Sequence, residues 1–202
     1  YQIHWPARNV PMFGQYEYDP AAERDAASLR SQLEAMDRLI AEGKVRHVGV
    51  SNEKPWGLMT CLRLADTLGL PRVASIQNPY SLLNRTFEQG LAEVALREDV
   101  PLLAYSPLAA GTLAGKYLDG AVPAGARRAI DHRKSRYDTV NADAAVRAYH
   151  DIARRHGLDP TRMAIAFVAR QPFVASALIG ATTMAHLESN IDALGVALAA
   201  AV

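Results

Sequence analysis

Polar side chains in this 202-residue sequence follow short runs of β-branched and aromatic residues, which are typical of strands. Together they supply an imidazole that could polarise or protonate a carbonyl, amides that could hold a carboxamide, an aromatic face, and a helix N-terminus suited to phosphate. Each also has a structural interpretation, such as a buried histidine with satisfied hydrogen bonds, a helix cap or a turn. In chain order the positions are His4, Ser51-Asn52, Gln77-Asn78, Tyr105-Ser106 and Gly180–Thr183.

The elements that must position these residues alternate between strands and helices. Apolar runs predict strands at Tyr1–Trp5, Val45–Val50, Val73–Gln77, Leu102–Tyr105 and Val174–Ile179. Apolar residues at helical spacing predict helices at Leu29–Ala41, Trp56–Leu68, Phe87–Leu96, Ala142–His156, Thr161–Arg170 and Met184–Leu194. The three middle strands begin near positions 45, 73 and 101, and such even alternation is typical of βαβ units around a parallel sheet.

Two parallel α/β folds fit this alternation, and the positions of the glycines separate them. A doubly wound sheet usually carries a glycine-rich phosphate site in its first strand–helix turn, but here that turn, Pro6–Ser28, holds only Gly14. The glycine-bearing turns instead follow the fourth and fifth strands. A complete (β/α)8 TIM barrel takes roughly 250 residues, or about 31 per unit. We therefore predict a single domain over residues 1–202, an incomplete barrel with strands 4–8 that lacks the first three βα units.

Composition and charge exclude several classes of protein. Lys and Arg number 22 against 21 Asp and Glu, so the net charge of +1 gives no general attraction to nucleic acid or to an anionic membrane. The sequence contains no run of 18 apolar residues, the length that a transmembrane helix requires. Cys61 is the single cysteine, which suits a reducing cytoplasm, and its place on an apolar helical face predicts a role in packing.

Other nucleotide and metal motifs are absent or imperfect. Gly111–Tyr117 is similar to a Walker A loop, but it has three residues between its glycines and a tyrosine where Ser or Thr is required. The six histidines and one cysteine show no metal-ligand spacing. Within the long stretch Ser106–Asn141, a cluster of cations could be a solvated loop or a phosphate funnel. The members of this cluster are Arg127, Arg128, Arg133, Lys134 and Arg136, and we single out Arg127.

Five motifs occur in order along nearly the whole chain: YQIHWP at 1–6, GKVRHVGVSN at 43–52, IQNPYSLLNR at 76–85, YSPLAAGTLAGKY at 105–117 and LIGATTMAHLESN at 178–190. Together they resemble the aldo-keto reductase family, in particular its Tas-type branch near the potassium-channel β-subunits. Five motifs in register are far more specific than any one alone. The resemblance implies a (β/α)8 barrel, in agreement with the strand spacing, and an NADP(H) cofactor.

The resemblance also implies roles for residues at the nicotinamide end of that cofactor. His4 matches the family's catalytic histidine, which holds the carbonyl oxygen of the substrate. Ser51, Asn52 and Gln77 match the residues that grip the nicotinamide carboxamide. Tyr105 matches the aromatic residue that stacks on the nicotinamide ring and leaves one face open for hydride transfer. Hydrogen-bond donors around a hydride acceptor would stabilise the oxyanion as it forms.

Residues later in the chain match the parts of the family's site that bind the rest of the cofactor. The pyrophosphate loop is matched by Ser106, Leu108, Gly111 and Lys116. Arg127 matches an arginine that reaches the adenosine end. The segment that binds the adenosine 2′-phosphate and the adenine is matched by Gly180, Thr182, His186 and Asn190.

The chain departs from the family pattern in three places. The catalytic Asp, Tyr and Lys of the family lie upstream of Tyr1, so the printed chain has no tyrosine general acid and is expected to be inactive alone. No Lys or Arg follows Arg170, His186 stands where many relatives have a basic residue, and Ser189 replaces a glutamate that binds adenine. NADP preference therefore rests on the family and the loop. The chain also stops at Val202, before the family's terminal helix and tail.

The expected function is NADPH-dependent transfer of a hydride to an aldehyde or ketone, or from the corresponding alcohol, with a small carbonyl compound as the partner. A competing expectation is a non-catalytic, NADPH-binding regulatory protein that resembles the potassium-channel β-subunits. A third is a partial chain that folds poorly by itself.

Overall fold

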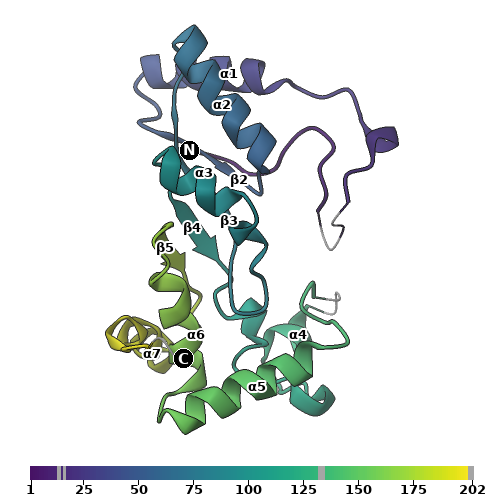
Figure 1. The fold of residues 1–202 in the computed structure, drawn as a ribbon, viewed down its shortest axis with the longest axis vertical. Helices are drawn as coiled ribbons and strands as arrows, with labels where there is room; N and C mark the ends of the chain where they lie inside the picture. Colours follow the sequence, from purple (N-terminus) through teal and green to yellow (C-terminus); the bar gives the residue numbers. More distant parts are fainter. Residues whose placement is uncertain (13–14, 16, 132–134, 200–202) are drawn as a thin grey trace. The chain divides into compact units, whose positions relative to one another are not determined.

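Strands alternate with helices along the described part of the chain, as the spacing of the apolar runs predicts (Figure 1). This computed structural model describes residues 1–12, 15, 17–131 and 135–199. The strands are β1 (Gln2–Ile3), β2 (Val48–Ser51), β3 (Val73–Pro79), β4 (Leu102–Tyr105) and β5 (Val174–Leu178), in the sheet order β1-β2-β3-β4-β5. Strand β2 pairs in parallel with both β1 and β3, so the prediction of an α/β fold with a parallel sheet is confirmed.

The chain divides into two units, which share β4. The first unit comprises residues 1–78 and 87–103, and the second comprises residues 79–86 and 104–202. Gly14, Arg133, Lys134 and Val202, which were discussed above, lie outside the described residues.

The first unit packs three helices with β1, β2 and β3. They are α1 (Leu29–Ala41), α2 (Pro55–Leu68) and α3 (Leu91–Arg97), with short 3-10 turns at Pro20–Ala22 and Thr86–Glu88, the second of which ends in this unit. Helix α1 begins where the Ser28 hydroxyl accepts a hydrogen bond from the Ser31 N–H at 3.0 Å. The core of the first unit contains side chains that are at most 2% exposed, among them Leu33, Val48, Val50, Leu58, Leu62, Ile76 and Leu102.

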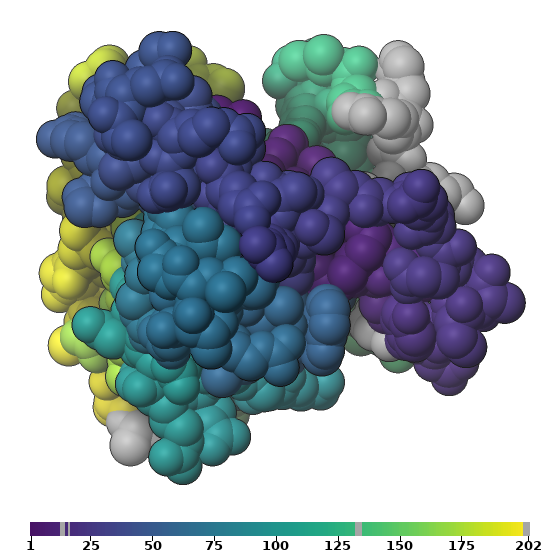
Figure 2. Space-filling model, turned by 90° about the horizontal axis from the view of Figure 1, so that it is seen from above, coloured from purple at the N-terminus to yellow at the C-terminus, as the bar shows by residue number. Residues whose placement is uncertain are grey.

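The segment between β1 and α1 lies largely on the surface. Residues 17–25 are all exposed, and the purple atoms of this segment lie on the face of the molecule that Figure 2 shows. Hydrogen bonds nevertheless hold it in place, because Arg24 Nε donates to the Ala7 carbonyl at 2.9 Å and Asn9 Nδ2 donates to the Asp19 carbonyl at 2.7 Å. The two ends of this predicted strand–helix loop are therefore joined by hydrogen bonds of Asn9 and Arg24.

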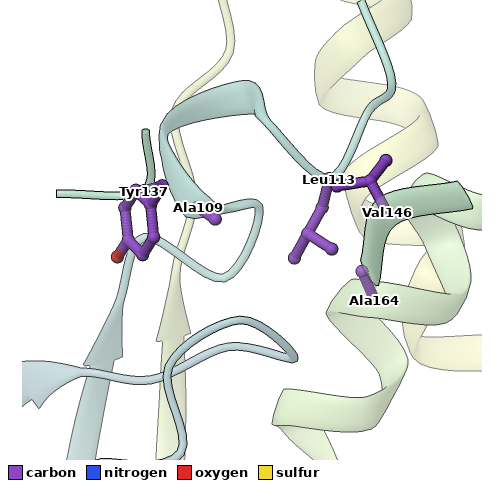
Figure 3. Packing of buried hydrophobic residues seen from close by; sticks show 5 residues of the cluster. All are labelled: Ala109, Leu113, Tyr137, Val146 and Ala164. Atoms are coloured by element: carbon purple, nitrogen blue, oxygen red, sulfur yellow. The ribbon is translucent and has the colours of Figure 1, made fainter. Parts of the chain in front are cut away.

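The second unit is mostly helical. Its helices are α4 (Arg127–Ile130), α5 (Ala142–Arg155), α6 (Pro160–Ala169) and α7 (Met184–Asp192), with 3-10 turns at Ala109–Gly111, Leu118–Gly120 and Ala193–Gly195. Figure 3 shows part of its core, in which Leu113, Val146 and Ala164 lie together and Tyr137 lies beside Ala109. Elsewhere in the unit the buried Tyr80 ring stacks on Phe167, with centroids 5.9 Å apart, and meets the edge of Phe173 at 5.3 Å.

Several predicted boundaries are wrong, each for a local reason. Strand β2 begins at Val48 rather than Val45, because the N–H groups of Lys44 and Val45 both bond to the Leu39 carbonyl and close the end of α1. Helix α3 begins at Leu91 rather than Phe87, because Gly90 with φ 93° interrupts it after a 3-10 turn.

Other predicted elements are confirmed or shifted by a few residues. Helix α1 and strand β4 have the predicted bounds. Strand β1 is shorter than predicted and β3 extends to Pro79. The elements α2, α5 and β5 differ by one residue at one end, and α6 differs by one residue at both ends. Helix α7 ends at Asp192, where a 3-10 turn follows. The stretch Ser106–Asn141 was predicted to lack regular structure, but its described part contains α4 and two 3-10 turns.

Candidate cofactor and active site

The first unit brings together four of the predicted site residues at the ends of β1, β2 and β3. The register pairs Ser51 with Gln77, and the Ser51 hydroxyl donates to the Gln77 carbonyl at 2.7 Å. The Asn52 N–H donates to the same carbonyl at 3.0 Å, and Asn52 Nδ2 donates to the His4 carbonyl at 2.9 Å. One short network of hydrogen bonds therefore joins the ends of three neighbouring strands.

Asn52 is the centre of this network, and its backbone has the conformation that the network requires. Its φ of 58° lies in the left-handed region, which asparagine adopts more readily than most residues. Asn52 is buried, and its Nδ2 also donates to the Ser51 hydroxyl at 3.1 Å. The interpretation of Ser51-Asn52 as a simple helix cap is wrong, because Lys54 occupies the N-cap position of α2.

His4 and Gln77 present polar groups that the network leaves available. The His4 side chain is exposed and its ring contacts Trp5, with centroids 5.1 Å apart, so the interpretation as a buried histidine is wrong. Within the described residues, no hydrogen bond is formed by the His4 imidazole or by the half-buried side-chain amide of Gln77. Asn78 is different, since it is buried and its Nδ2 donates to the Glu53 carbonyl at 3.0 Å.

Tyr105, at the end of β4, lies in the second unit beside an arginine. Arg136 Nη1 donates to the Tyr105 hydroxyl at 3.3 Å, and the guanidinium carbon lies 5.9 Å from the ring centroid. Burial raises the pKa of the Tyr105 hydroxyl, and the positive charge of Arg136 opposes that rise. The sequence places Arg136 only within a cluster of cations, and no local pattern indicates its contact with Tyr105.

The loop after β4 holds several residues in strained backbone conformations. Ser106, Ala109 and Ala110 have φ between 50° and 57°, a region that costs non-glycine residues free energy and that is frequent at ligand-binding loops. Gly111 has φ 91°, and a Cβ there would lie 2.9 Å from Lys116 Cε. The Leu108 carbonyl accepts the N–H groups of Gly111 and Leu113 and closes the turn.

Neighbouring arginines at the start of α4 have opposite environments. Arg127 is exposed, and its guanidinium forms no hydrogen bond or ion pair with a described residue. Arg128 donates to the Thr112 hydroxyl at 3.2 Å, pairs with Asp138, and lies 4.0 Å over the Tyr117 ring. Among the described cations of the cluster, Arg127 therefore remains available for a ligand, while Arg128 is part of the fold.

The start of α7 gathers most of the residues predicted to bind the adenosine end. Thr183 caps the helix by accepting the His186 N–H at 3.1 Å, and the Thr182 hydroxyl lies 3.2 Å from His186 Nδ1. Gly180, Thr182 and His186 are exposed, whereas Asn190 is buried.

A cation that the sequence of α7 lacks comes from another helix. Arg162 of α6 donates through Nε to the Ser189 hydroxyl at 3.3 Å and pairs with Asp192 at 3.1 Å. Helix α7 therefore has a neighbouring guanidinium, although no Lys or Arg follows Arg170 in the sequence. This contact joins residues 27 positions apart, so no spacing rule within one helix could indicate it.

No helix in the described part of the chain has both the length and the apolar character needed to cross a membrane. No group of three or more His, Cys, Asp or Glu side chains within it is arranged as a metal site.

These features define an α/β protein with a parallel sheet whose strand ends carry polar, hydrogen-bonding side chains. The chain belongs to the aldo/keto reductase family, whose family model matches residues 1–202. The resemblance that the five motifs indicate is thus confirmed.

Individual relatives support the same conclusion. The chain is 56% identical over 194 residues to protein tas of Escherichia coli K12, and the matched region covers 96% of this chain and 56% of that protein. It is 30% identical over 167 residues to L-glyceraldehyde 3-phosphate reductase of Escherichia coli K12, covering 79% and 47% of the two chains. It is 28% identical over 172 residues to a probable voltage-gated potassium channel subunit beta of Arabidopsis thaliana, covering 83% and 52%. The chain spans about half the length of these relatives.

Proposed function

We propose that the protein is an NADPH-dependent oxidoreductase that transfers a hydride between the cofactor and a small aldehyde or ketone, or the corresponding alcohol. The observation that carries this proposal is the network at the ends of β1, β2 and β3, in which Asn52 joins the His4 and Gln77 segments. It places an exposed imidazole and an available amide at the edge of a parallel sheet where ligands of α/β proteins usually bind.

The side chains of the first unit fit the nicotinamide end of the cofactor. A primary carboxamide needs both a donor and an acceptor, and the Gln77 side chain offers both because no described residue uses them. Ser51 and Asn52 would complete the grip, and the His4 imidazole would donate a hydrogen bond to the carbonyl oxygen of the substrate. When bound, the nicotinamide supplies the hydride.

The side chains of the second unit fit the remaining parts of the cofactor. Tyr105 would offer its ring to the nicotinamide face, and the strained loop would hold the pyrophosphate through Ser106, Leu108, Gly111 and Lys116. Arg127 is exposed and available to the adenosine phosphate. The positive end of α7 would favour the same phosphate, together with Gly180, Thr182, His186 and Asn190.

We also propose that the fold is a (β/α)8 barrel in one domain and that this chain supplies strands 4–8 of it. In that arrangement the Asp, Tyr and Lys of the family's catalytic set come from a segment outside residues 1–202, so the chain alone does not reduce carbonyls. The parallel pairing of β1, β2 and β3 and the family match support this reading. A cytoplasmic location is proposed on the basis of the family alone.

The similarity to a potassium-channel subunit keeps one competing function open, in which NADPH binds but no substrate is reduced. The test uses the protein expressed at its full natural length. Loss of NADPH absorbance on addition of a panel of aldehydes and ketones is the expected result, and tight binding without turnover would favour the regulatory function instead.

His4 can be tested with a matched control in the same unit. His4→Gln should lower kcat while the affinity for NADPH is kept, because the substituted side chain contacts the substrate and its backbone carbonyl still binds Asn52. His47→Gln is the control, since His47 is also an exposed histidine of the first unit. Equal kcat values for the two variants would remove His4 from the reaction.

A further inference from the structure

Arg8 and Glu53 form an ion pair beside the network that joins His4 to Asn52, with Glu53 buried and Arg8 half-buried. We propose that this pair is a positioning device: it holds the two segments that carry His4 and Asn52 in the arrangement that the proposed reductase requires. The inference rests on the proposed function. Neither residue would touch the cofactor or substrate, so both are positioning residues rather than catalytic ones.

The geometry of the pair is that of a rigid, two-point contact. Arg8 Nη1 lies 2.9 Å from Glu53 Oε2, and Nη2 lies 2.5 Å from Oε1. The two side chains are only 18% and 3% exposed. A bidentate guanidinium–carboxylate contact fixes orientation as well as distance, and a buried carboxylate must keep its partner because water cannot replace it.

The pair acts on the His4 and Asn52 segments because of where its members lie in the sequence. Glu53 directly follows Asn52, and Arg8 lies four residues after His4. The segments 4–8 and 52–53 are therefore joined twice, once by Asn52 Nδ2 on the His4 carbonyl and once by the ion pair. Two separate contacts prevent the rotation that a single hydrogen bond would allow.

Glu53 extends the contact to the neighbouring elements. Its Oε1 accepts the Lys54 N–H at 2.7 Å at the start of α2, and its carbonyl accepts Asn78 Nδ2 at 3.0 Å at the end of β3. Asn78 follows Gln77, the proposed carboxamide ligand. A shift of the Glu53 backbone would therefore move all three polar strand ends together.

Helix α2 is shaped to accept the pair. Gly57 lies within the first turn of α2, and a Cβ at this position would overlap both the Glu53 carboxylate and the Arg8 guanidinium. The Arg8 guanidinium also lies 4.9 Å over the Trp56 ring. Burial alone would lower the pKa of Arg8, but the hydrogen bonds and charge of Glu53 outweigh it and raise that pKa.

The decisive experiment compares single and double neutral variants of the protein at its full natural length. Glu53→Gln and Arg8→Met should each lower the melting temperature, because each leaves one buried charge without a partner. Each should also lower NADPH affinity or kcat/KM by about 10²-fold, the cost of a small misplacement of binding groups. NADPH affinity is read from cofactor fluorescence, separately from kcat and KM.

The double variant Arg8→Met/Glu53→Gln separates positioning from stability. It leaves no unpaired charge, so the melting temperature should recover most of the loss, whereas NADPH affinity and kcat/KM should stay low. Recovery of all three quantities would overturn the proposal. Glu93→Gln is the control, because it removes the 2.7 Å pair with Arg97 on α3. The side chains of Glu93 and Arg97 are 67% and 74% exposed.

A measurement on the free protein keeps this inference distinct from the proposed function. If the parent protein does not bind NADPH, the proposed function is wrong. The arrangement of segments 4–8 and 52–53 can still be measured in the ligand-free protein. Hydrogen exchange at the Asn52 N–H and the NMR signals of the His4 ring should both change in the double variant and not in Glu93→Gln. Unchanged signals in the double variant would overturn the positioning role.

Discussion

Gln77 contributes to the candidate site in two ways that mutation can separate. Its carbonyl is part of the fold, since it accepts hydrogen bonds from the Ser51 hydroxyl and the Asn52 N–H. Its side-chain amide has no partner among the described residues, so it is available to a ligand. Substitution of the side chain alone therefore leaves the network of strand ends intact.

Gln77→Ala should weaken NADPH binding by roughly 1–3 kcal/mol and leave folding unchanged, because a buried amide of the ligand loses its partner. Titration of cofactor fluorescence gives the affinity, and thermal unfolding gives the stability. Gln171→Ala is a suitable control, since Gln171 Nε2 donates to the Phe167 carbonyl at 3.0 Å within α6 and its neighbouring turn. If Gln77→Ala lowers stability and not affinity, Gln77 is only a structural amide.

Arg127 and Arg128 allow a test of cofactor preference with adjacent residues of the same type. Arg127→Ala should lower the affinity for NADPH about fivefold and leave that for NADH unchanged, as expected for an exposed charge that meets the 2′-phosphate. Arg128→Ala should instead lower stability by about 1–3 kcal/mol, because Thr112 and the Tyr117 ring lose their contacts. The opposite pattern would show that the phosphate is held by Arg128.

Cys61 provides a pH-dependent test of burial. Desolvation, and then the charge of Glu53, raise the pKa of the Cys61 thiol to about 12. In the unfolded chain the thiol ionises near its ordinary pKa, about 8.5, so between this value and 12 the unfolded state alone loses a proton. The contribution of Cys61 to stability is therefore complete below pH 8 and falls by about 1.4 kcal/mol per pH unit above pH 9.

Cys61→Ala should accordingly show a flatter decline in stability than the parent between pH 9 and pH 11, measured by urea unfolding. The other alkaline titrations are common to both proteins, so the difference between the curves isolates the thiol. Parallel curves would mean that the thiol ionises equally in the folded and unfolded states.

At the scale of single elements, α2 shows how one glycine serves a neighbouring contact. A glycine in a helix usually costs about 0.5–1 kcal/mol relative to alanine. At Gly57 an added Cβ would meet the ends of Arg8 and Glu53, and these can move aside only by giving up their bidentate geometry. Helical propensity and local packing therefore act in opposite directions at this position.

Gly57→Ala should destabilise the protein by about 1–3 kcal/mol, the range for overpacking, instead of stabilising it. Gly195→Ala is the control, because nothing lies within 4 Å of the position of its Cβ and its φ is not positive. Unfolding in urea measures both variants. A gain in stability for Gly57→Ala would show that the pair is not tightly enclosed.

Elements with a clear local signal are the ones that the sequence predicts well. Helix α1 and strand β4 have their predicted bounds, since Ser28 and Gly43 mark the helix and a compact apolar run marks the strand. The start of β2 is wrong because Val45 is β-branched but its N–H closes the end of α1. Local propensity cannot reveal that a backbone group is already used by the preceding helix.

The candidate site shows the same limit over longer separations. The resemblance identifies which residues should meet the cofactor, but the sequence does not indicate the pairs that support them. Arg8 and Glu53 are 45 positions apart, Arg136 and Tyr105 are 31 apart, and Arg162 and Ser189 are 27 apart. Such pairs arise from the tertiary fold, and no spacing within one helix or strand encodes them.

At the scale of the whole molecule, the chain covers 56% of the length of protein tas. We expect residues 1–202 alone to show no carbonyl reduction, because an incomplete barrel leaves unpaired strand edges and lacks the proposed general acid. The protein at its full natural length should be active under the same conditions. Turnover by purified residues 1–202, with contaminating enzymes excluded, would contradict the incomplete-barrel proposal.

The packing of Tyr80 against Phe167 and Phe173 has a consequence for synthesis of the protein on the ribosome. Residues 79–86 belong to the second unit although they precede residues 87–103 of the first. Tyr80 is therefore synthesised long before the two phenylalanines that its ring contacts. Protein synthesis adds about 5–20 residues per second, so the Tyr80 ring remains without these packing partners for several seconds. A nascent chain halted before Phe167 would present that ring to chaperones, whereas a chain extended beyond Phe173 would enclose it.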